Sequence, residues 1–142
     1  MKFKEPHLSI GLDIGSSTIK LVKLKSLKDK VELFDFILEP VQANLVETLK
    51  NIKVAKGIQV VNIGVCGPST VIRYVSFPKM NALELKQALK FEAQKHIPFT
   101  MEEVNLDGYI LQENLPDNKM LVLIAVAKKE LINQRIKLIE DA

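Results

Sequence analysis

The N-terminal part of the chain consists of short apolar runs separated by links too short to hold a helix. Apolar and β-branched residues fill positions 8–13, 18–25 and 31–38, with only a few residues between one run and the next. Parallel neighbours need a crossover of roughly a dozen residues or more, so links of this length join antiparallel strands. Residues 31–38 also alternate between apolar and polar side chains, as a strand with one buried face does. The sequence therefore predicts a three-stranded antiparallel meander.

The rest of the chain continues with a different order of elements. The spacing of apolar residues predicts a helix, a buried strand, a strand, a helix, two strands and a last helix. They are expected at residues 43–52, 58–67, 70–77, 81–97, 104–111, 120–127 and 129–141. The group strand, helix, strand, strand has the character of an inserted lobe. The predicted fold class is therefore α/β, in the α+β sense, with residues 1–67 and 129–142 in one lobe and residues 68–128 in a smaller inserted one.

The helix expected at residues 81–97 has the clearest signals. Glu84 follows Asn81 by three positions, the spacing at which an N-cap residue and a carboxylate satisfy each other's backbone amides. Pro98 ends the segment. An apolar stripe at four-residue steps predicts the side that faces the core, and it consists of Leu85, Leu89, Ala93 and Ile97.

Composition limits the classes to which the chain can belong. Of its 142 residues 47% are hydrophobic and 26% charged, enough for a core in one domain or two small lobes. No apolar run reaches the roughly 20 residues that span a bilayer, and the basic start lacks the apolar stretch of a secretory signal. The single cysteine, Cys66, cannot form an internal disulfide, so a reducing, cytoplasmic setting is expected. Because Cys66 lies in an apolar run, it is predicted to be a small core side chain.

The net charge of +3 is unevenly distributed. Two interpretations of a lysine-rich stretch stay open: a solvated hairpin face, or a patch facing acidic lipid or nucleic acid. Nucleic acid is not an expected partner, because the chain has no Trp, its arginines are Arg73 and Arg135, and no aromatic residues interleave with basic ones. The stretch contains Lys20, Lys23, Lys25, Lys28 and Lys30.

A polar turn between the first two predicted strands is the candidate site. Gly15 permits backbone conformations closed to other residues and lets another group approach the main chain. The amides of Gly15, Ser16 and Ser17 and the hydroxyls of Ser16, Ser17 and Thr18 are donors suited to an anion. An ordinary structural turn accounts for the same residue types.

Two charged residues flank this turn. Asp13 would repel a phosphate unless a divalent cation such as Mg²⁺ stood between them, as it commonly does at nucleotide phosphates. Lys20 would add positive charge from the next strand. No other metal site is expected, because His7 and His96 lack partners at metal-ligand spacing; His96 is predicted to be a surface residue or a helix-dipole contact.

Position and sequence together resemble a known superfamily. The stretch "GLDIGSSTIKLVKL" (residues 11–24) lies where the actin, Hsp70 and sugar kinase superfamily carries its first phosphate loop. It resembles that loop in the PilM proteins of type IV pilus assembly and in their relative FtsA. Residues 69–111 resemble the small lobe inserted in both, and "HIPF" followed by "EEVNLDGYIL" is more similar to PilM. The resemblance extends from Leu8 to the final helix.

The resemblance implies a partial actin-like, RNase H-like lobe, ATP with Mg²⁺, and a scaffold role in type IV pilus assembly or related secretion. The family docks the N-terminal cytoplasmic tail of an inner-membrane protein, PilN, beside the inserted lobe, with contacts expected near Val71, Tyr74 and Phe91. The expected location is cytoplasmic and peripheral to the inner membrane, with membrane contact only through the partner. The resemblance implies that the cofactor-binding residues are Asp13, Gly15, Ser16, Ser17, Thr18 and Lys20. Asp13 would lie next to the metal, and the others would contact phosphate.

The same resemblance implies parts that this sequence lacks. PilM proteins are far longer and have a second Asp-x-Gly phosphate loop and a Gly-rich adenosine pocket, whereas Asp107 and Gly108 fall inside a predicted strand here. The chain is therefore expected to be an N-terminal portion with half of a nucleotide site. ATP with Mg²⁺ is expected in the full-length fold, and weak or absent binding and no catalysis are expected of this chain alone. An unfinished sheet would favour self-association. Two alternatives stay open: an FtsA-like division protein, and part of an active ATPase or sugar kinase.

Overall fold

The computed structural model describes residues 7–142 and divides them into two compact units. The first unit contains the described residues up to Gly64 together with Lys137–Ala142, and the second contains Val65–Ile136. Both are mixed α/β, so the predicted fold class is confirmed. No helix among residues 7–142 has the length and apolar character needed to cross a bilayer.

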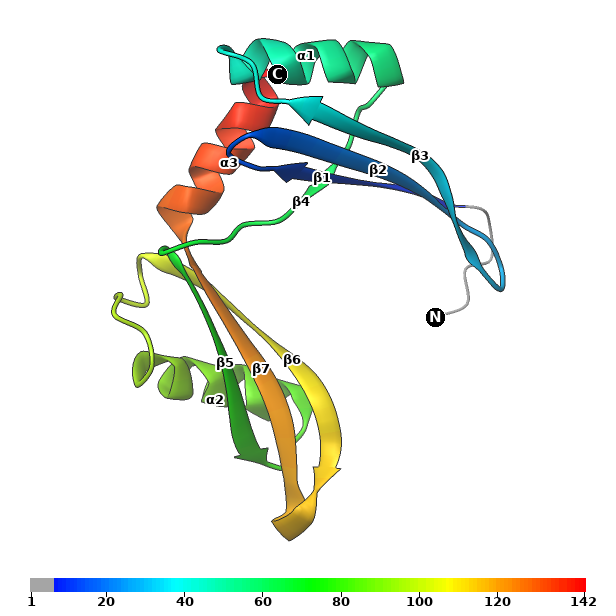
Figure 1. Ribbon diagram of the computed structural model, residues 1–142. Coiled ribbons are helices and arrows are strands. Elements are labelled where there is room, and N and C mark those ends of the chain that lie inside the picture. Colours follow the sequence, from blue (N-terminus) through cyan, green and yellow to red (C-terminus); the bar gives the residue numbers. More distant parts are fainter. Residues whose placement is uncertain (1–6) are drawn as a thin grey trace. The chain divides into compact units, whose positions relative to one another are not determined.

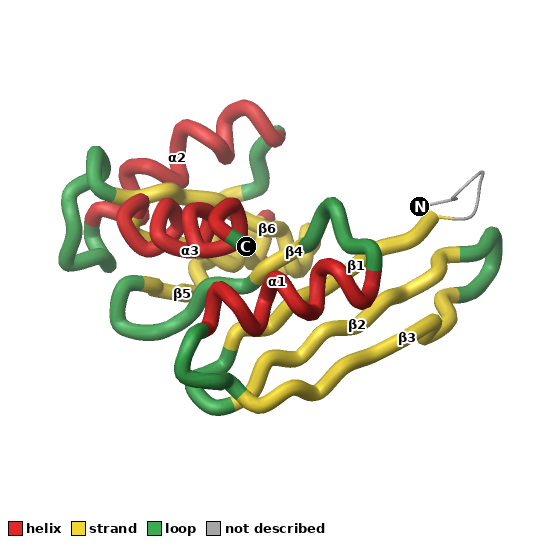
Figure 2. The backbone as a smooth tube through the Cα atoms, turned by 90° about the horizontal axis from the view of Figure 1, so that it is seen from above, coloured by secondary structure: helices red, strands yellow, loops and turns green. Residues whose placement is uncertain are grey.

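The first unit is a four-stranded sheet with one helix on one face (Figures 1 and 2). The meander predicted from the turn lengths is confirmed: β1, β2 and β3 pair antiparallel, and a short strand, β4, pairs parallel with β1 on the far side. The order across the sheet is β3-β2-β1-β4. The elements are β1 (His7–Ile14), β2 (Thr18–Ser26), β3 (Val31–Pro40), α1 (Leu45–Lys56) and β4 (Asn62–Ile63).

Helix α1 covers one face of this sheet because alternate side chains of β1 and β2 are apolar. Leu12, Ile19 and Leu21 are buried against Leu49 and Ile52 of the helix. The helix begins where the Asn44 side chain accepts a hydrogen bond from the Glu47 amide and ends at Gly57, whose left-handed φ of 60° suits a glycine C-cap.

The second unit is a three-stranded antiparallel sheet in the order β5-β7-β6, again with one helix on one face (Figure 1). Its chain order, strand, helix, strand, strand, agrees with the predicted pattern. The elements are β5 (Thr70–Pro78), α2 (Ala82–Gln94), β6 (Val104–Leu115), the short 3-10 turn η1 (Pro116–Asn118) and β7 (Lys119–Lys128). The last helix, α3 (Lys129–Asp141), follows directly.

The core of the second unit lies between α2 and the central strand. Met120, Val122, Ile124 and Val126 alternate along β7 and are buried against the helix. Of the predicted apolar stripe Leu85, Leu89 and Ala93 are buried, while Ile97 lies beyond the helix end and is partly buried.

The predicted capping box at the start of α2 is confirmed. The Asn81 side chain accepts hydrogen bonds from the Leu83 and Glu84 amides, both over 3.0 Å. The Glu84 carboxylate accepts one from the Asn81 amide over 2.9 Å. Three backbone amides at the helix start are thereby satisfied by one pair of side chains.

Two details of the prediction differ from the structure. The buried strand expected at 58–67 is only Asn62–Ile63, because it pairs with Gly11 and Leu12 of β1 alone. The unit borders lie at 64/65 and 136/137 instead of the expected 67/68 and 128/129. At the second border, Lys129 donates hydrogen bonds from its amide to the Glu103 carbonyl and from Nζ to the Glu102 carbonyl. These bonds hold the beginning of α3 in the second unit.

Candidate functional site

The candidate site is the turn between β1 and β2. Antiparallel pairing places Asp13 opposite Lys20 and Ile14 opposite Ile19, which leaves residues 15–18 to reverse the chain. Within the turn the Gly15 amide donates a hydrogen bond to the Thr18 carbonyl oxygen over 3.1 Å. The turn is therefore closed by its own backbone, as in a tight hairpin.

Gly15 is required at this turn for one of the two reasons that the sequence suggests. A Cβ at this position would lie 2.8 Å from the Thr18 carbonyl oxygen, so close approach of another group is confirmed, and that group belongs to the turn itself. The expected special conformation is wrong, because Gly15 is not among the residues with positive φ. The idea that the Gly15 amide faces an anion is also wrong here, since this amide is already bonded to Thr18.

The tip of the turn keeps unpaired donors. Ser16 and Ser17 are exposed, and no hydrogen bond within residues 7–142 uses their amides or their hydroxyls. The Ser17 carbonyl accepts from the Val41 amide over 2.9 Å, which fixes the turn to the segment after β3. Two exposed amides and two hydroxyls are thus held on an anchored loop, with the half-buried Thr18 beside them.

Asp13 and Lys20 form an ion pair across the hairpin. Lys20 Nζ lies 2.8 Å from Asp13 Oδ2, and both side chains are largely exposed. Leu12 and Leu21 face α1 and strand side chains alternate, so this pair lies on the sheet face opposite the helix. Exposed pairs of this kind contribute little to stability, on the order of 1 kcal/mol or less. Both charged groups therefore remain free to exchange partners.

The ion pair borders an open depression on the same face of the sheet. The depression has a volume of about 430 Å³ and is lined by Gly11, Asp13, Lys20, Asn62 and Gly64 among others. The Asn62 side chain donates to the Ile10 carbonyl over 3.1 Å, so it braces β4 against β1 at this point. The Asp13 carboxylate, the Lys20 ammonium and the end of β4 next to Gly64 thus border one depression.

The chemistry of these donors suits a metal-bound phosphate. Asp13 is a hard oxygen ligand of the kind that Mg²⁺ prefers, and Lys20 and the tip of the turn supply positive charge and donors. Within residues 7–142 no group of three or more His, Cys, Asp or Glu side chains is placed to hold a metal ion. A cation beside Asp13 would therefore take its other ligands from phosphate oxygens and water.

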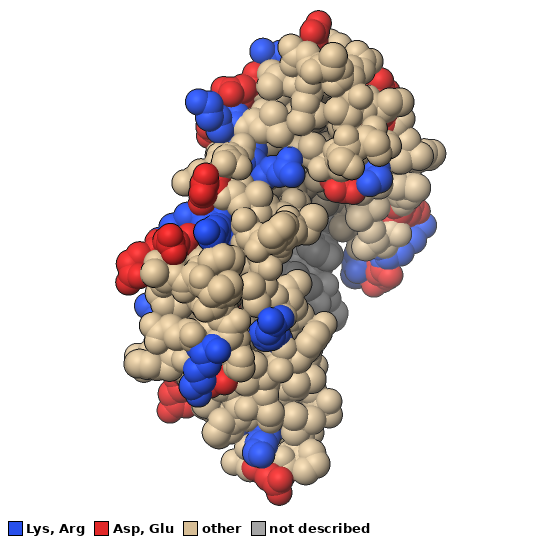
Figure 3. All heavy atoms as spheres, turned by 60° about the vertical axis from the view of Figure 1, so that its left-hand side comes forward, with Lys and Arg blue, Asp and Glu red and all other residues tan. Residues whose placement is uncertain are grey.

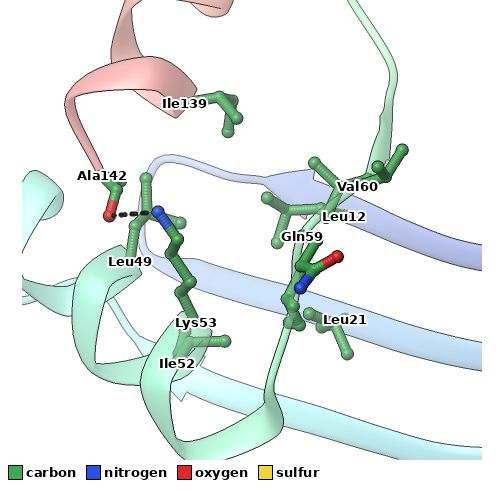
Figure 4. Close-up of a pocket in the computed structure, with 11 residues that line it drawn as sticks. Leu12, Leu21, Leu49, Ile52, Lys53, Gln59, Val60, Ile139 and Ala142 are labelled. Carbon is green, nitrogen blue, oxygen red and sulfur yellow. Dashed lines mark hydrogen bonds between the residues drawn. The ribbon is translucent and has the colours of Figure 1, made fainter.

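A second pocket of the first unit lies on the face of the sheet that α1 covers (Figure 4). The ion pair lies on the opposite face. Its volume is about 290 Å³, and apolar side chains from β1, β2, α1 and α3 form its walls, Leu12, Leu21, Leu49 and Ile139 among them. Lys53, whose Nζ lies 3.5 Å from the Ala142 carbonyl oxygen, is the one charged side chain in its lining. This pocket lacks the convergent donors that phosphate needs.

The lysine-rich stretch does not form one basic patch. Lys20 pairs with Asp13, Lys30 pairs with Glu32, and Lys23 is 8% exposed, with its Nζ donating to the Lys56 carbonyl oxygen over 2.7 Å. Acidic and basic side chains are interspersed on the face shown in Figure 3. The structure thus favours a solvated hairpin with local partners.

Two other sequence expectations have clear outcomes. Cys66 is exposed, so its prediction as a core side chain is wrong; the strand expected around it ends at Ile63 and leaves Cys66 in the following link. His96 is a surface residue as predicted, with its Nε2 3.0 Å from Glu92 Oε1. Bonds from Lys95 and His96 hold the pKa of the Glu92 carboxyl below its ordinary value.

The residues expected to contact a partner lie on different surfaces. Val71 packs against the core beneath α2, whereas Phe91 is exposed on the helix itself. Tyr74 is 67% exposed and points to the sheet face opposite α2, because Val71 and Val75 on the same strand point toward the core. The structure therefore does not bring these three side chains together.

The uncovered face of the second sheet is a surface that the sequence analysis missed. Register places Tyr74, Leu123 and Tyr109 side by side across β5, β7 and β6. In the neighbouring row Ile72 lies opposite the small Ala125, and the hollow there has a volume of about 280 Å³. Alternation along β5 and β6 contains this signal, but it emerges only once the strand register is known.

Comparison with solved structures supports this architecture. A structure described as the PilM-PilN type IV pilus biogenesis complex matches with a TM-score of 0.77 and 24% identity, over 94% of this chain and 44% of that one. The cytoplasmic domain of EpsL, an inner membrane component of the type II secretion system of Vibrio cholerae, matches with a TM-score of 0.57 and 10% identity. That match covers 94% of this chain and 52% of the EpsL chain. The chain thus spans about half the length of these two structures or less.

The sequence itself gives the family. Residues 11–142 match the family described as type IV pilus assembly protein PilM, a range that includes the β1–β2 turn, the inserted unit and the last helix. The match covers far more than half of the chain. The chain therefore belongs to the PilM family of type IV pilus assembly proteins.

Proposed function

We propose that the chain is the N-terminal part of a cytoplasmic scaffold that binds ATP with Mg²⁺ and docks the cytoplasmic tail of a PilN-like inner-membrane protein. The scaffold would lie peripheral to the inner membrane through this partner. Family membership supports a role in type IV pilus assembly. The observation that carries the docking part is the row of Tyr74, Leu123 and Tyr109 on a sheet face that no described element of its unit covers.

The β1–β2 turn supports the nucleotide part of the proposal. Ser16 and Ser17 would donate to phosphate oxygens, Asp13 would hold Mg²⁺ directly or through water, and Lys20 would turn from Asp13 to the phosphates. The bound metal would neutralise phosphate charge beside the carboxylate. These groups would hold phosphates and a metal ion, so nucleotide binding is the role that this turn supports.

The tyrosine row supports the docking part. Tyrosines combine a large apolar ring with a polar end and are frequent anchors at protein interfaces. Tyr109 is 69% exposed and flanks the half-buried Leu123 from the side opposite Tyr74. An extended tail with apolar side chains would place one of them in the hollow above Ala125. A PilN tail is the occupant that the similar complex suggests.

One NMR experiment with two additions tests both parts. In the full-length protein, Mg-ATP should shift the Ser16 and Ser17 amide signals, and a synthetic peptide of the PilN-like tail should shift those of Tyr74, Tyr109 and Leu123. Asp13→Ala should abolish the first set, and Tyr74→Ala with Tyr109→Ala should weaken the peptide roughly tenfold or more.

The matched controls are Asp117→Ala in the other hairpin and Phe91→Ala on α2. Asp117→Ala should leave the affinity for Mg-ATP unchanged, because Asp117 lies in η1. Phe91→Ala should leave the affinity for the peptide unchanged, because Phe91 lies on the helix side of the sheet. Unchanged Ser16 and Ser17 signals at saturating Mg-ATP would end the nucleotide proposal. Peptide affinity that falls with Phe91 and not with the tyrosines would end the docking proposal.

A further inference from the structure

A groove runs along the other side of the second sheet, between α2 and β6. It has a volume of about 770 Å³ and lies entirely within the second unit. Buried Leu85 and Leu89 of the helix form its inner wall, and the half-buried Leu106, Ile110 and Met101 add to its apolar lining. The exposed Tyr109 lies at its β6 edge. Strand β6 is at the end of the strand order, so no further strand of the unit covers this side.

One rim of the groove is basic. Lys86 and Lys90 are exposed on α2 at the i, i+4 spacing, and within residues 7–142 neither has an ion-pair or hydrogen-bond partner. Like charges at this spacing weaken a helix, so the local fold gains nothing from placing two lysines here. Lys129 adds a third cation to the lining, although its Nζ also donates to the Glu102 carbonyl oxygen.

The opposite rim has different chemistry. Asp107 on β6 is the one acidic residue in the lining, but its register partner is Ala125, so its side chain points to the face opposite α2. Its carboxylate accepts a hydrogen bond from the Gly108 amide over 2.8 Å. Lys86 and Lys90 therefore face no carboxylate across the groove, which has an apolar lining and one basic rim.

We propose that this groove binds a short amphipathic segment of a partner protein whose apolar side chains are flanked by acidic ones. The apolar side chains lie on Leu106 and Ile110, and the carboxylates face Lys86 and Lys90. Charge complementarity selects this occupant, because a basic segment would meet three lysines and a nucleic acid would leave the apolar lining uncovered. The groove shares Tyr109 with the tyrosine row at the β6 edge, but its apolar wall lies on the α2 side of the sheet. The proposal does not depend on the nucleotide or tail proposals.

Labelled synthetic peptides of equal length provide the test. In fluorescence anisotropy, a peptide with alternating Leu and Glu should bind the full chain, and binding should weaken as salt rises. A peptide with alternating Leu and Lys should not bind at this site. The double variant Lys86→Glu, Lys90→Glu should weaken the Leu-Glu peptide on the order of tenfold, as expected for two exposed pairs.

A matched double variant, Lys50→Glu with Lys137→Glu, makes the same charge change at two residues of the first unit that do not line the groove. It should leave affinity within roughly twofold after correction for net charge. If the first variant unfolds, Lys86→Gln with Lys90→Gln removes the charges with less disturbance and should still weaken binding. Equal binding of the two peptides, or no loss in either groove variant, overturns the proposal. Amide shifts at Tyr74 and Leu123 instead of Leu106 and Ile110 overturn it as well. Sedimentation showing peptide-free dimers that the Lys86→Glu, Lys90→Glu variant abolishes would assign the groove to a second copy.

Discussion

The two units have similar architectures but differ in the contacts that hold the helix against the sheet. Each has a sheet with one helix on one face, and in both the other face is uncovered by the described elements of that unit. In the second unit the covered face is apolar: Met120, Val122, Ile124 and Val126 are at most 3% exposed. In the first unit the corresponding face includes a lysine, Lys23, that is only 8% exposed.

Charged contacts therefore help to hold α1 on the sheet of the first unit, whereas apolar contacts hold α2 in the second. Lys23 Nζ donates to the Lys56 carbonyl oxygen at the last turn of α1, where a cation also opposes the negative end of the helix dipole. Lys56 Nζ in turn lies 2.8 Å from Asp35 Oδ2 on β3. These contacts link β2, β3 and α1. The comparison suggests that shape holds α2 in place while α1 is held partly by charge.

The largest expected effect tests the role of shape in the second unit. A Cβ at position 108 would lie 2.5 Å from Cδ1 of the buried Leu89, so Gly108 allows α2 to approach β6 closely. Gly108→Val should therefore reduce the free energy of unfolding by about 2–3 kcal/mol through overpacking. Urea unfolding followed by tyrosine fluorescence reports this unit alone, because both tyrosines of the chain, Tyr74 and Tyr109, lie on its strands.

Gly64→Val provides the matched control, since no atom lies within 4 Å of a Cβ built at Gly64. It should leave the tyrosine transition unchanged. A Gly108→Val protein that is as stable as the wild type would show that α2 moves away from the strand easily. Shape would then not be what distinguishes the second unit from the first.

Local sequence signals account for the parts of the fold that were predicted correctly. Short links fixed the antiparallel meander, and the Asn81–Glu84 spacing fixed the start of α2, because both depend on neighbours in sequence. The length of β4 was not predictable in this way. It depends on how much of β1 pairs with β4. Because β4 ends at Ile63, Cys66 lies outside the sheet and is exposed.

For a related reason, the sequence does not indicate which face of each sheet its helix covers. Strand β7 is apolar on both sides, so the sequence does not say that Val122 faces α2 while Leu123 faces away. The candidate site shows the same limit: the charged and hydroxyl residues of the β1–β2 turn were found from the sequence, and the pairing of Asp13 with Lys20 needed the register. The bond that occupies the Gly15 amide needed the geometry of the turn.

The next largest effect tests the role of charge in the first unit. Lys23→Met keeps the length and apolar stem of the side chain but removes its hydrogen bond to the Lys56 carbonyl oxygen. Loss of a charged bond at a helix C-terminus should reduce the stability of this unit by about 1–2 kcal/mol. Far-ultraviolet circular dichroism should record the loss, while tyrosine fluorescence, which reports the second unit, should not.

The exposed Lys50 on the same helix gives the matched control, because it has no ion-pair or hydrogen-bond partner within residues 7–142. Lys50→Met should change stability by less than roughly 0.5 kcal/mol. Should Lys23→Met prove as stable as the control, the apolar stem of Lys23 and not its charge would be what matters. The proposed contrast between the units would then be wrong.

The smallest effect is a pH dependence that belongs to the first unit. The bond from Lys56 holds the pKa of the Asp35 carboxyl below its ordinary value of 3.8. Since the folded pKa is the lower one, the carboxylate stabilises the fold fully above about 3.8, and this contribution is lost as pH falls through the folded value. Asp35→Asn should therefore be less stable than the wild type near neutral pH, with a gap that closes on acidification below this range.

Thermal unfolding at several pH values measures this gap directly. Other carboxyls also have a lowered pKa, Glu92 and Glu103 in the second unit among them. Their protonation in acid destabilises wild type and variant alike, so the difference in stability between the two proteins reports Asp35 alone. Asp29→Asn on the β2–β3 turn is the matched control, because Asp29 has no ion-pair or hydrogen-bond partner within residues 7–142. A gap that stays constant down to pH values well below 3.8 would mean that the Asp35 charge contributes nothing. The link between β3 and α1 would then depend on the packing of the Lys56 stem.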